Sequence, residues 1–249
     1  MSEDPPTNPV QTTRASGRLL WTLADRGPST LAELEAAVDL TKGAVFNHLA
    51  TLAEAGFVDK RGNQYAVSPR VLQLGEAARR AFPGMDVARE SVHRLAEMTG
   101  EVAAVVVWTG TDAVVVETAV GELGVPGWFS LGERLPLAST AAGKMVLSTL
   151  PDDDFERLAR ETASSDDVAY EALIDEIRTV RTQDLAFDRG EYSSDRYSVA
   201  APVLGGDDTL RCVLTVSGPK ARLSGMALQQ DIAGLVVNAA SRVQKEIRS

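Results

Sequence analysis

The chain has 249 residues, of which 44% are hydrophobic, and its formal net charge is -10. Its length allows one or two domains, no apolar run approaches the ~20 residues of a membrane span, and the first residues lack the pattern of a secretory signal. The single cysteine, Cys212, excludes an internal disulfide framework. We therefore expect a cytoplasmic protein with no membrane contact and no cofactor.

The charge is unevenly distributed along the chain. Residues 1–82 hold nine Lys/Arg and nine Asp/Glu, whereas residues 83–249 hold 16 basic and 26 acidic residues. An acidic protein is a poor general DNA binder, but here the acidic excess lies entirely outside the first 82 residues. Only five of the 25 basic residues are lysines. This acid-rich, lysine-poor composition suggests a halophilic archaeon as the source, with a mesophile of high-GC genome as the alternative.

The first elements in chain order are a tail and two helices. We expect residues 1–10, which contain three prolines, to form a disordered tail. Residues 11–26 have apolar positions at helical spacing. A second helix is expected over Leu31–Val38, and Thr30 with Glu33 has the spacing of a capping box at its start.

A third helix and a small hairpin follow. Thr41 is a good N-cap for a helix that runs to about Ala55, and Gly56 is placed to end it. Two short strands, 57–60 and 64–67, surround a turn and form a wing. Residues 11–68 therefore have the layout of a winged helix-turn-helix domain.

The remainder is expected to contain a linker helix over residues 69–84, ended by Pro83-Gly84, and a second domain over 85–249. In that domain we expect a helix at 86–99, with Met98 on its buried face, and a hairpin of Val102–Trp108 and Ala113–Val120. Further helices are expected at 139–150, 152–162, 168–183 and 224–247, and strands at 186–189, 199–204 and 210–217. The fold class is α+β, and a mostly antiparallel sheet with helices at both ends of the segment is typical of GAF- and PAS-type sensor domains.

Several segments resemble the IclR family of transcriptional regulators. They are the N-terminal unit, the linker helix and the runs GERLPLASTAAGKMVL, LAFDRGEY, VAAPV and LTVSGP, which follow the family order over about 240 residues. The resemblance implies a winged helix-turn-helix joined by a helix to a GAF-like effector domain. It also implies a sequence-specific regulator of transcription that binds an operator in double-stranded DNA, responds to a small organic effector and forms a homodimer or homotetramer. Repression and activation are not distinguished.

The third helix is expected to read DNA, because a recognition helix enters the major groove with its N-terminal residues leading. Asn47 suits a bidentate contact with adenine, and wing residues can reach phosphates. The expected DNA-binding residues are Thr41, Lys42, Gly43, Ala44, Phe46, Asn47, His48 and Thr51 on the helix, and Lys60, Arg61 and Asn63 on the wing.

Two positions of this helix leave alternatives open, and a third feature departs from the family pattern. Phe46 either touches a thymine methyl group or packs against the wing, and packing is favoured. His48 either contacts phosphate or is a half-buried, hydrogen-bonded histidine, with equal weight. Family members commonly carry Ser-Thr where this chain has Gly43-Ala44, so backbone N–H groups must replace the missing hydroxyls.

The resemblance places the effector site in the C-terminal domain. The matched residues are Thr140, Ala141, Ala142, Asp188, Ser198, Thr215 and Ser217, and Trp128 is a candidate lid. Strand alternation independently puts Thr215 and Ser217 on one face, and a helix start near 139–142 offers N–H groups. Asp188 would accept hydrogen bonds from hydroxyls, which favours a sugar, a sugar acid or a hydroxy or keto acid. The competing interpretations are a plain N-cap for Thr140, a surface acid for Asp188, and β-propensity for Thr215 and Ser217.

Two other classes of function compete with a ligand-controlled regulator. An enzyme is disfavoured, because the chain has two histidines and no credible Ser-His-Asp set, and Ala138 and Met145 break a phosphate loop around Gly143-Lys144. A metal site is not expected either. A ligand-independent protein-interaction module placed on DNA is the second rival, and it predicts no thermal stabilisation by sugars or organic acids.

Overall fold

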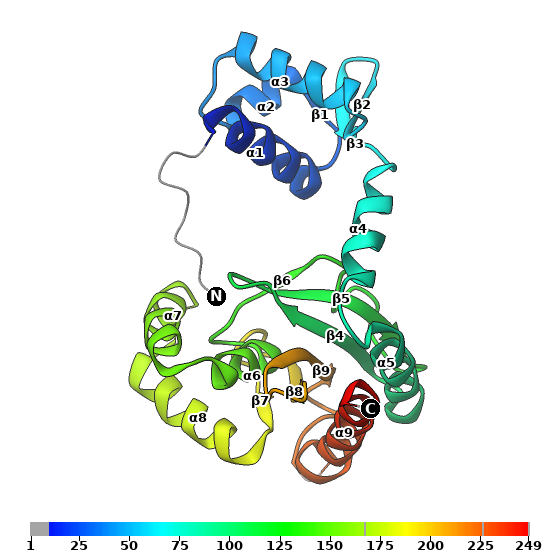
Figure 1. Cartoon of the computed structure of the whole chain (residues 1–249), viewed down its shortest axis with the longest axis vertical. Coiled ribbons are helices and arrows are strands. Elements are labelled where there is room, and N and C mark those ends of the chain that lie inside the picture. The colour runs from blue at the N-terminus through cyan, green and yellow to red at the C-terminus, as the bar shows by residue number, and fades with distance from the viewer. Residues whose placement is uncertain (1–9, 167, 226, 249) are drawn as a thin grey trace. The chain divides into compact units, whose positions relative to one another are not determined.

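The structure, a computed structural model, describes residues 10–166, 168–225 and 227–248 (Figure 1). The predicted tail at residues 1–10 therefore lies outside the described residues except for Val10. The chain divides between Ala81 and Phe82 into two compact units, next to the predicted boundary at Pro83-Gly84. Each unit has its own hydrophobic core.

The N-terminal unit is the predicted winged helix-turn-helix. It contains α1 (Gln11–Arg26), α2 (Leu31–Ala37), α3 (Lys42–Glu54), β2 (Val58–Arg61), β3 (Gln64–Val67) and α4 (Val71–Arg80). The capping box is present, since the Thr30 side chain accepts a hydrogen bond from the Glu33 N–H and the Glu33 carboxylate accepts one from the Thr30 N–H. Leu19, Leu34 and Leu49 are fully buried where the three helices meet.

One element of this unit was not predicted. The two-residue strand β1 (Ser29–Thr30) pairs antiparallel with β3, which gives the sheet order β1-β3-β2. The same pairing joins the start of α2 to the wing. A strand of two residues has no periodicity of its own, so only its partner strand reveals it.

The C-terminal unit is built on one antiparallel sheet of six strands in the order β6-β5-β4-β9-β8-β7. The strands are β4 (Val102–Trp108), β5 (Ala113–Val120), β6 (Arg134–Leu135), β7 (Ala186–Asp188), β8 (Arg196–Leu204) and β9 (Leu210–Pro219). The predicted hairpin of β4 and β5 is confirmed with the predicted bounds. The centre of the sheet pairs β4 with β9, more than 100 residues later in the chain.

Helices cover both faces of this sheet (Figure 1). One core layer packs α5 (Met85–Thr99) and α9 (Ala233–Arg248) against one face. On the opposite face, α6 (Ala141–Thr149) packs against the strands, and α7 (Asp152–Ser165) and α8 (Tyr170–Gln183) pack against α6. The predicted α+β fold with a GAF-like second domain is confirmed in this arrangement.

Several predicted details of the C-terminal unit were wrong. Met98 is 59% exposed, because Ala96 rather than Met98 completes the face of α5 that packs on the sheet. Strand β8 begins at Arg196, three residues earlier than predicted, and β6 was missed. The closing helix begins later than predicted, with a π-helical turn at Ala227–Ile232 that leads into α9.

Candidate functional site

Helix α3 presents one polar, exposed side. Val45, Leu49 and Leu52 are buried in the core of the N-terminal unit. Thr41 is the predicted N-cap, and its side chain accepts a hydrogen bond of 3.3 Å from the Ala44 N–H. The outward residues of the helix start and centre are exposed or half-buried, namely Lys42, Gly43, Ala44, Asn47, His48 and Thr51. The helix can therefore present this side to a partner.

The structure shows the surroundings of the two open positions on α3. Phe46 is 48% exposed and is not among the residues that pack on the core, and its favoured packing against the wing stays a prediction. Its position is about a quarter turn from the buried stripe. His48 is half-buried, and its Nδ1 lies 2.9 Å from the hydroxyl of Ser16 on α1. The hydrogen-bonded histidine is thus the correct interpretation of the structure.

A shallow groove of about 530 Å³ runs between α1 and α3. The groove is lined by four predicted DNA-binding residues of α3, namely Ala44, Asn47, His48 and Thr51. Three residues of α1 that were not predicted complete the lining, namely Thr12, Thr13 and Ser16. The Thr51 hydroxyl donates to the carbonyl of Asn47, whereas the Asn47 amide makes no hydrogen bond within the described part of the chain. The hydroxyl-rich start of α1, QTTRAS, is the sequence pattern that could have indicated these three residues of α1.

The wing is a tight antiparallel hairpin. Its turn contains Gly62, whose φ of 63° lies in the left-handed region that favours glycine. Lys60 lies over the ring of its cross-strand partner Tyr65, with 5.6 Å between the ammonium nitrogen and the ring centre. Arg61 and Asp59 approach to 3.8 Å, and Asn63 is exposed. The wing thus carries two exposed cations at its tip.

The predicted effector residues of the sheet meet on one face. Register pairs Asp188 of β7 with Ser198 of β8, and Ser198 with Ser217 of β9. Directly opposed residues of neighbouring antiparallel strands share a face, so the three side chains form a row across the sheet. Thr215 is two residues from Ser217 and is also buried, as is every member of the row.

Asp188 stands at the β7 end of this row and is only 1% exposed. One carboxylate oxygen accepts hydrogen bonds from the backbone N–H groups of Gly190 and Glu191 at 2.9 Å and of Tyr192 at 3.4 Å. The other accepts one from the Ser198 hydroxyl at 3.3 Å. The surface-acid interpretation was therefore wrong.

The titration of Asp188 follows from these surroundings. Burial raises the pKa of the Asp188 carboxyl and the charge of Glu191 raises it further, while the three N–H donors oppose the shift. Because the folded pKa lies above the unfolded one, the carboxyl stabilises the fold below the unfolded pKa. That contribution is lost as pH rises through the folded pKa.

We expect Asp188→Asn to remove this pH dependence, because the amide oxygen can still accept from the backbone and cannot ionise. The stability of the variant should therefore improve relative to the wild type as pH rises from the acidic side. Urea unfolding of the full chain at several pH values measures this difference. Asp184→Asn is the control, because Asp184 is exposed at the end of α8. Its backbone has the left-handed conformation that asparagine also adopts. Parallel pH curves for the wild type and Asp188→Asn would contradict the expectation.

The other predicted hydroxyls are engaged within the fold. The Thr140 hydroxyl donates to the Pro136 carbonyl at 2.7 Å and accepts from the Gly143 N–H at 3.0 Å, so Thr140 is the N-cap of α6. The Thr215 hydroxyl donates to the Val199 carbonyl, and Ser217 donates to the Tyr197 carbonyl. Ala141 and Ala142 follow the cap at the start of α6 and are buried against the sheet.

Arg196 stands on β8 next to this row and was missed by the sequence analysis. It precedes Ser198 by two residues on β8, and its Nε donates to the Ser217 hydroxyl at 2.7 Å. Aromatic side chains surround its guanidinium, with Cζ 4.3 Å from the ring centre of Phe129 and 5.5 Å from that of Trp128. The alternation that linked Thr215 with Ser217 points equally to Arg196, but the predicted strand started too late to include it.

A second unpredicted feature is the buried Lys144 of α6, which is 1% exposed. Its ammonium group donates to the carboxylates of Glu176 and Glu191 at 2.9 and 2.7 Å and to the Phe187 carbonyl at 2.9 Å. Glu176 lies on α8, and Glu191 lies in the turn whose N–H groups hold Asp188. Lys144 therefore ties α6, α8 and the Asp188 turn together.

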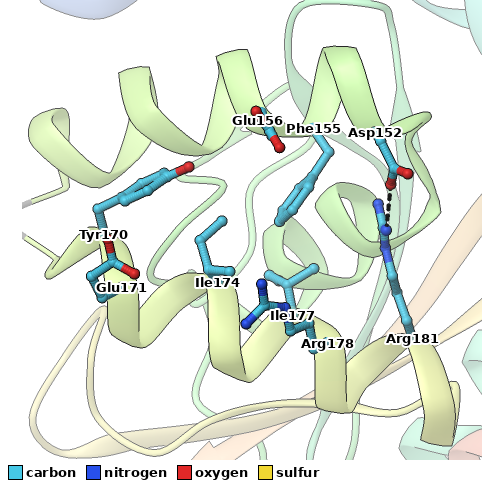
Figure 2. Close-up of a pocket in the computed structure, with 9 residues that line it drawn as sticks. All are labelled: Asp152, Phe155, Glu156, Tyr170, Glu171, Ile174, Ile177, Arg178 and Arg181. Carbon is cyan, nitrogen blue, oxygen red and sulfur yellow. Dashed lines mark hydrogen bonds and ion pairs between the residues drawn. The ribbon is translucent and has the colours of Figure 1, made fainter.

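A groove of about 420 Å³ lies between α7 and α8 (Figure 2). Figure 2 shows Phe155, Ile174 and Ile177 between the two helices, with Tyr170 at one end and the Asp152–Arg181 pair at the other. Arg181 also donates to two carbonyls at the end of α6, and its guanidinium lies over the Phe155 ring. The Arg181 guanidinium thus joins α8 to the end of α6 and the start of α7.

Within residues 10–166, 168–225 and 227–248, no group of three or more His, Cys, Asp and Glu side chains is placed to hold a metal ion. Burial raises the pKa of the Cys212 thiol to about 12, which disfavours the thiolate that metals bind. No helix in the same described ranges is long and apolar enough to cross a membrane.

The two units together define the class of winged helix-turn-helix proteins that carry a separate sensor-type domain. A family model described as "Bacterial transcriptional regulator IclR C-terminal" matches residues 84–245, and a MarR family model matches residues 12–64. The chain belongs to the IclR family of transcriptional regulators, which confirms the family resemblance and makes the protein a DNA-binding regulator rather than an enzyme.

Individual relatives agree with this assignment. The chain is 28% identical over 229 residues to the "probable HTH-type transcriptional regulator ArcR" of Halobacterium salinarum, covering 88% of this chain and 87% of that protein. An IclR family regulator from Brucella abortus has a similar structure, with a TM-score of 0.81, 19% identity and coverage of 99% and 96%. An IclR homolog from Microbacterium hydrocarbonoxydans, solved with 4-hydroxybenzoate, has a TM-score of 0.78, 16% identity and coverage of 95% and 98%.

Proposed function

We propose that this regulator binds its operator through the exposed side of α3 and the wing. The observation that carries the proposal is the Asn47 side chain, which is exposed on the groove side of α3 and makes no hydrogen bond within the described chain. An amide in that state can accept from adenine N6 and donate to N7. Phe46 is exposed beside it and is therefore available for an apolar contact with a thymine methyl group.

The remaining contacts position the helix on the phosphate backbone. Lys42, Lys60 and Arg61 supply exposed cations, and Asn63 supplies an exposed amide. The start of α3 is open, because nothing lies within 4 Å of a Cβ built on Gly43. The backbone N–H group of Gly43 can therefore approach a phosphate closely. Thr12 and Thr13 of α1 line the same groove and add hydroxyl donors.

We further propose that the C-terminal domain senses a small organic molecule at the row of buried polar residues. The support is the convergence of Asp188, Ser198 and Ser217 on one face of the sheet, in a family whose members are regulators with an effector domain. A protein of this fold has been solved with 4-hydroxybenzoate. Trp128 and Phe129 of the loop before β6 lie beside Arg196, which stands next to that row, where a lid would be.

Self-association belongs to the same proposal, as a homodimer or homotetramer that works in the cytoplasm. Helix α4 has no buried residue, and Leu72 and Leu74 are 76% and 54% exposed. A second copy of the chain is the partner that would cover this helix. Two copies would place two copies of α3 on a two-fold symmetric operator.

Asn47→Ala tests the reading of bases. We expect a loss of ~1–3 kcal/mol that is confined to one base pair of each half-site, so that sequence preference relaxes there. Lys60→Ala is the matched control, since losing a phosphate contact should weaken binding to operator and random DNA about equally. Binding isotherms on the operator, on single-base variants and on random DNA measure both effects. Equal losses on all sequences for Asn47→Ala would exclude base reading by this residue.

A further inference from the structure

Arg196 is a buried cation with an incomplete set of partners. It is only 7% exposed and stands on β8 next to the row formed by Asp188, Ser198 and Ser217. Its Nε donates to the Ser217 hydroxyl. Neither Nη atom makes a hydrogen bond within the described residues, and no carboxylate of those residues comes within 4.0 Å of the guanidinium.

Three other buried charged side chains of this domain have close hydrogen-bond partners. Lys144 has two carboxylates and a carbonyl within 2.9 Å. Glu101 is held by both the Nε and an Nη of Arg222 at 2.6 and 2.8 Å. Asp188 has its backbone N–H donors. Since a buried charge without a counter-ion is costly, Arg196 stands out as the position where an anion is missing.

The aromatic surroundings do not replace that anion. The guanidinium carbon lies 4.3 Å from the ring centre of Phe129, 5.5 Å from that of Trp128 and 5.6 Å from that of Tyr192. Ring faces stabilise the positive charge, but they give the Nη N–H groups no acceptor within the described residues. Burial lowers the pKa of Arg196, while the charges of Glu133 and Asp188 oppose that shift, and the group remains a cation.

We propose that Arg196 is the specificity-determining residue of the effector site and that its unsatisfied N–H groups bind the carboxylate of an organic acid. This inference rests on the proposed sensing function of the same site. A planar guanidinium matches a carboxylate with two parallel hydrogen bonds. Asp188 and Ser198 lie on the same face and suit a hydroxyl group of the ligand. The effector is then a hydroxylated or keto acid, and neutral sugars are excluded.

The test compares acids with neutral analogues of the same shape. Isothermal titration calorimetry of the full chain uses the pairs 4-hydroxybenzoate and 4-hydroxybenzamide, pyruvate and pyruvamide, and gluconate and glucose. We expect wild-type protein to bind at least one acid and to bind its neutral partner more weakly by roughly 10- to 100-fold, because one charge-assisted hydrogen-bonded pair is lost. Arg196→Gln should bind the two members of the pair equally.

Two further variants separate recognition from structure. Arg189→Gln is the matched control, because Arg189 also lies over an aromatic ring, that of Phe187, but is exposed. It should retain the preference for the acid. Arg196→Lys keeps the charge and loses the planar fork, so it should show an intermediate preference. This variant also keeps the test valid if Arg196→Gln does not fold.

The outcomes are distinct. A preference for acids that is lost in Arg196→Gln and kept in Arg189→Gln supports the proposal. Equal binding of an acid and its neutral analogue by the wild type overturns the role of Arg196 and leaves the sensing function intact. The role of Arg196 is likewise overturned if both glutamine variants keep the preference. Binding of no compound by the wild type overturns the sensing function as well.

Discussion

Lys144→Met is expected to lower the stability of the C-terminal domain by about 3 kcal/mol. The ammonium group is buried and is shared by Glu176, Glu191 and the Phe187 carbonyl. Without it, two carboxylates face one another with no cation between them. The two glutamates are 33% and 38% exposed, so water relieves part of the cost and the effect falls at the lower end for a broken buried ion pair.

Urea unfolding of the full chain measures this loss. Lys245→Met is the control, because Lys245 lies exposed on α9 of the same domain and the same change of side chain should leave stability almost unaltered. Lys144 also holds the turn that carries the N–H donors of Asp188, so hydrogen exchange of that turn should speed up in the variant. If Lys144→Met and Lys245→Met unfold at the same urea concentration, the network contributes nothing to stability.

Gly143→Ala is expected to destabilise α6 and its domain by about 2–3 kcal/mol, because the added methyl group overpacks a closed site. A Cβ at this position would lie 2.2 Å from the Pro136 carbonyl oxygen and 2.5 Å from the Cα of Leu137. Both atoms are backbone, so a rotamer change cannot relieve the clash. Helix propensity alone favours alanine by about 1 kcal/mol. A loss of stability would therefore show that the steric clash outweighs helix propensity, and a gain would show the reverse.

Gly234→Ala provides the matched comparison for this prediction. Gly234 lies in α9 of the same domain, and nothing lies within 4 Å of a Cβ built there. Its replacement should leave stability unchanged or raise it slightly. Thermal unfolding of the two variants gives the comparison. A Gly143→Ala protein as stable as Gly234→Ala would mean that the N-terminal turn of α6 can move away from Pro136 at no cost.

Local signals predicted much of this fold correctly. The capping box of Thr30 and Glu33 and the left-handed glycines Gly56 and Gly100 marked helix ends where the structure has them. Such signals depend on atoms a few residues apart, so a short stretch of sequence contains the whole interaction. The β4–β5 hairpin was predictable for the same reason, because its two runs are adjacent in the chain.

Contacts between distant residues were not predictable in this way. The Ser16–His48 hydrogen bond joins residues 32 apart, and β1 is a strand only because β3 lies beside it. Arg196 was assigned to a loop, because its place in β8 depends on pairing with Pro219 at the far end of β9. Met98 was placed on the buried face of its helix, although the helix turns it away from the core.

The sequence by itself therefore determined the order of the elements, the α+β class and the resemblance to the IclR family, since periodicity, caps and turns are encoded locally. It also indicated the polar residues that the sheet brings into one row. Only the tertiary structure decided that β4 pairs with β9 and that Lys144 and Arg196 are both buried. Only the tertiary structure showed that Lys144 has carboxylate partners and that Arg196 has none within the described residues. Burial and hydrogen bonding depend on neighbours that the fold brings from far along the chain.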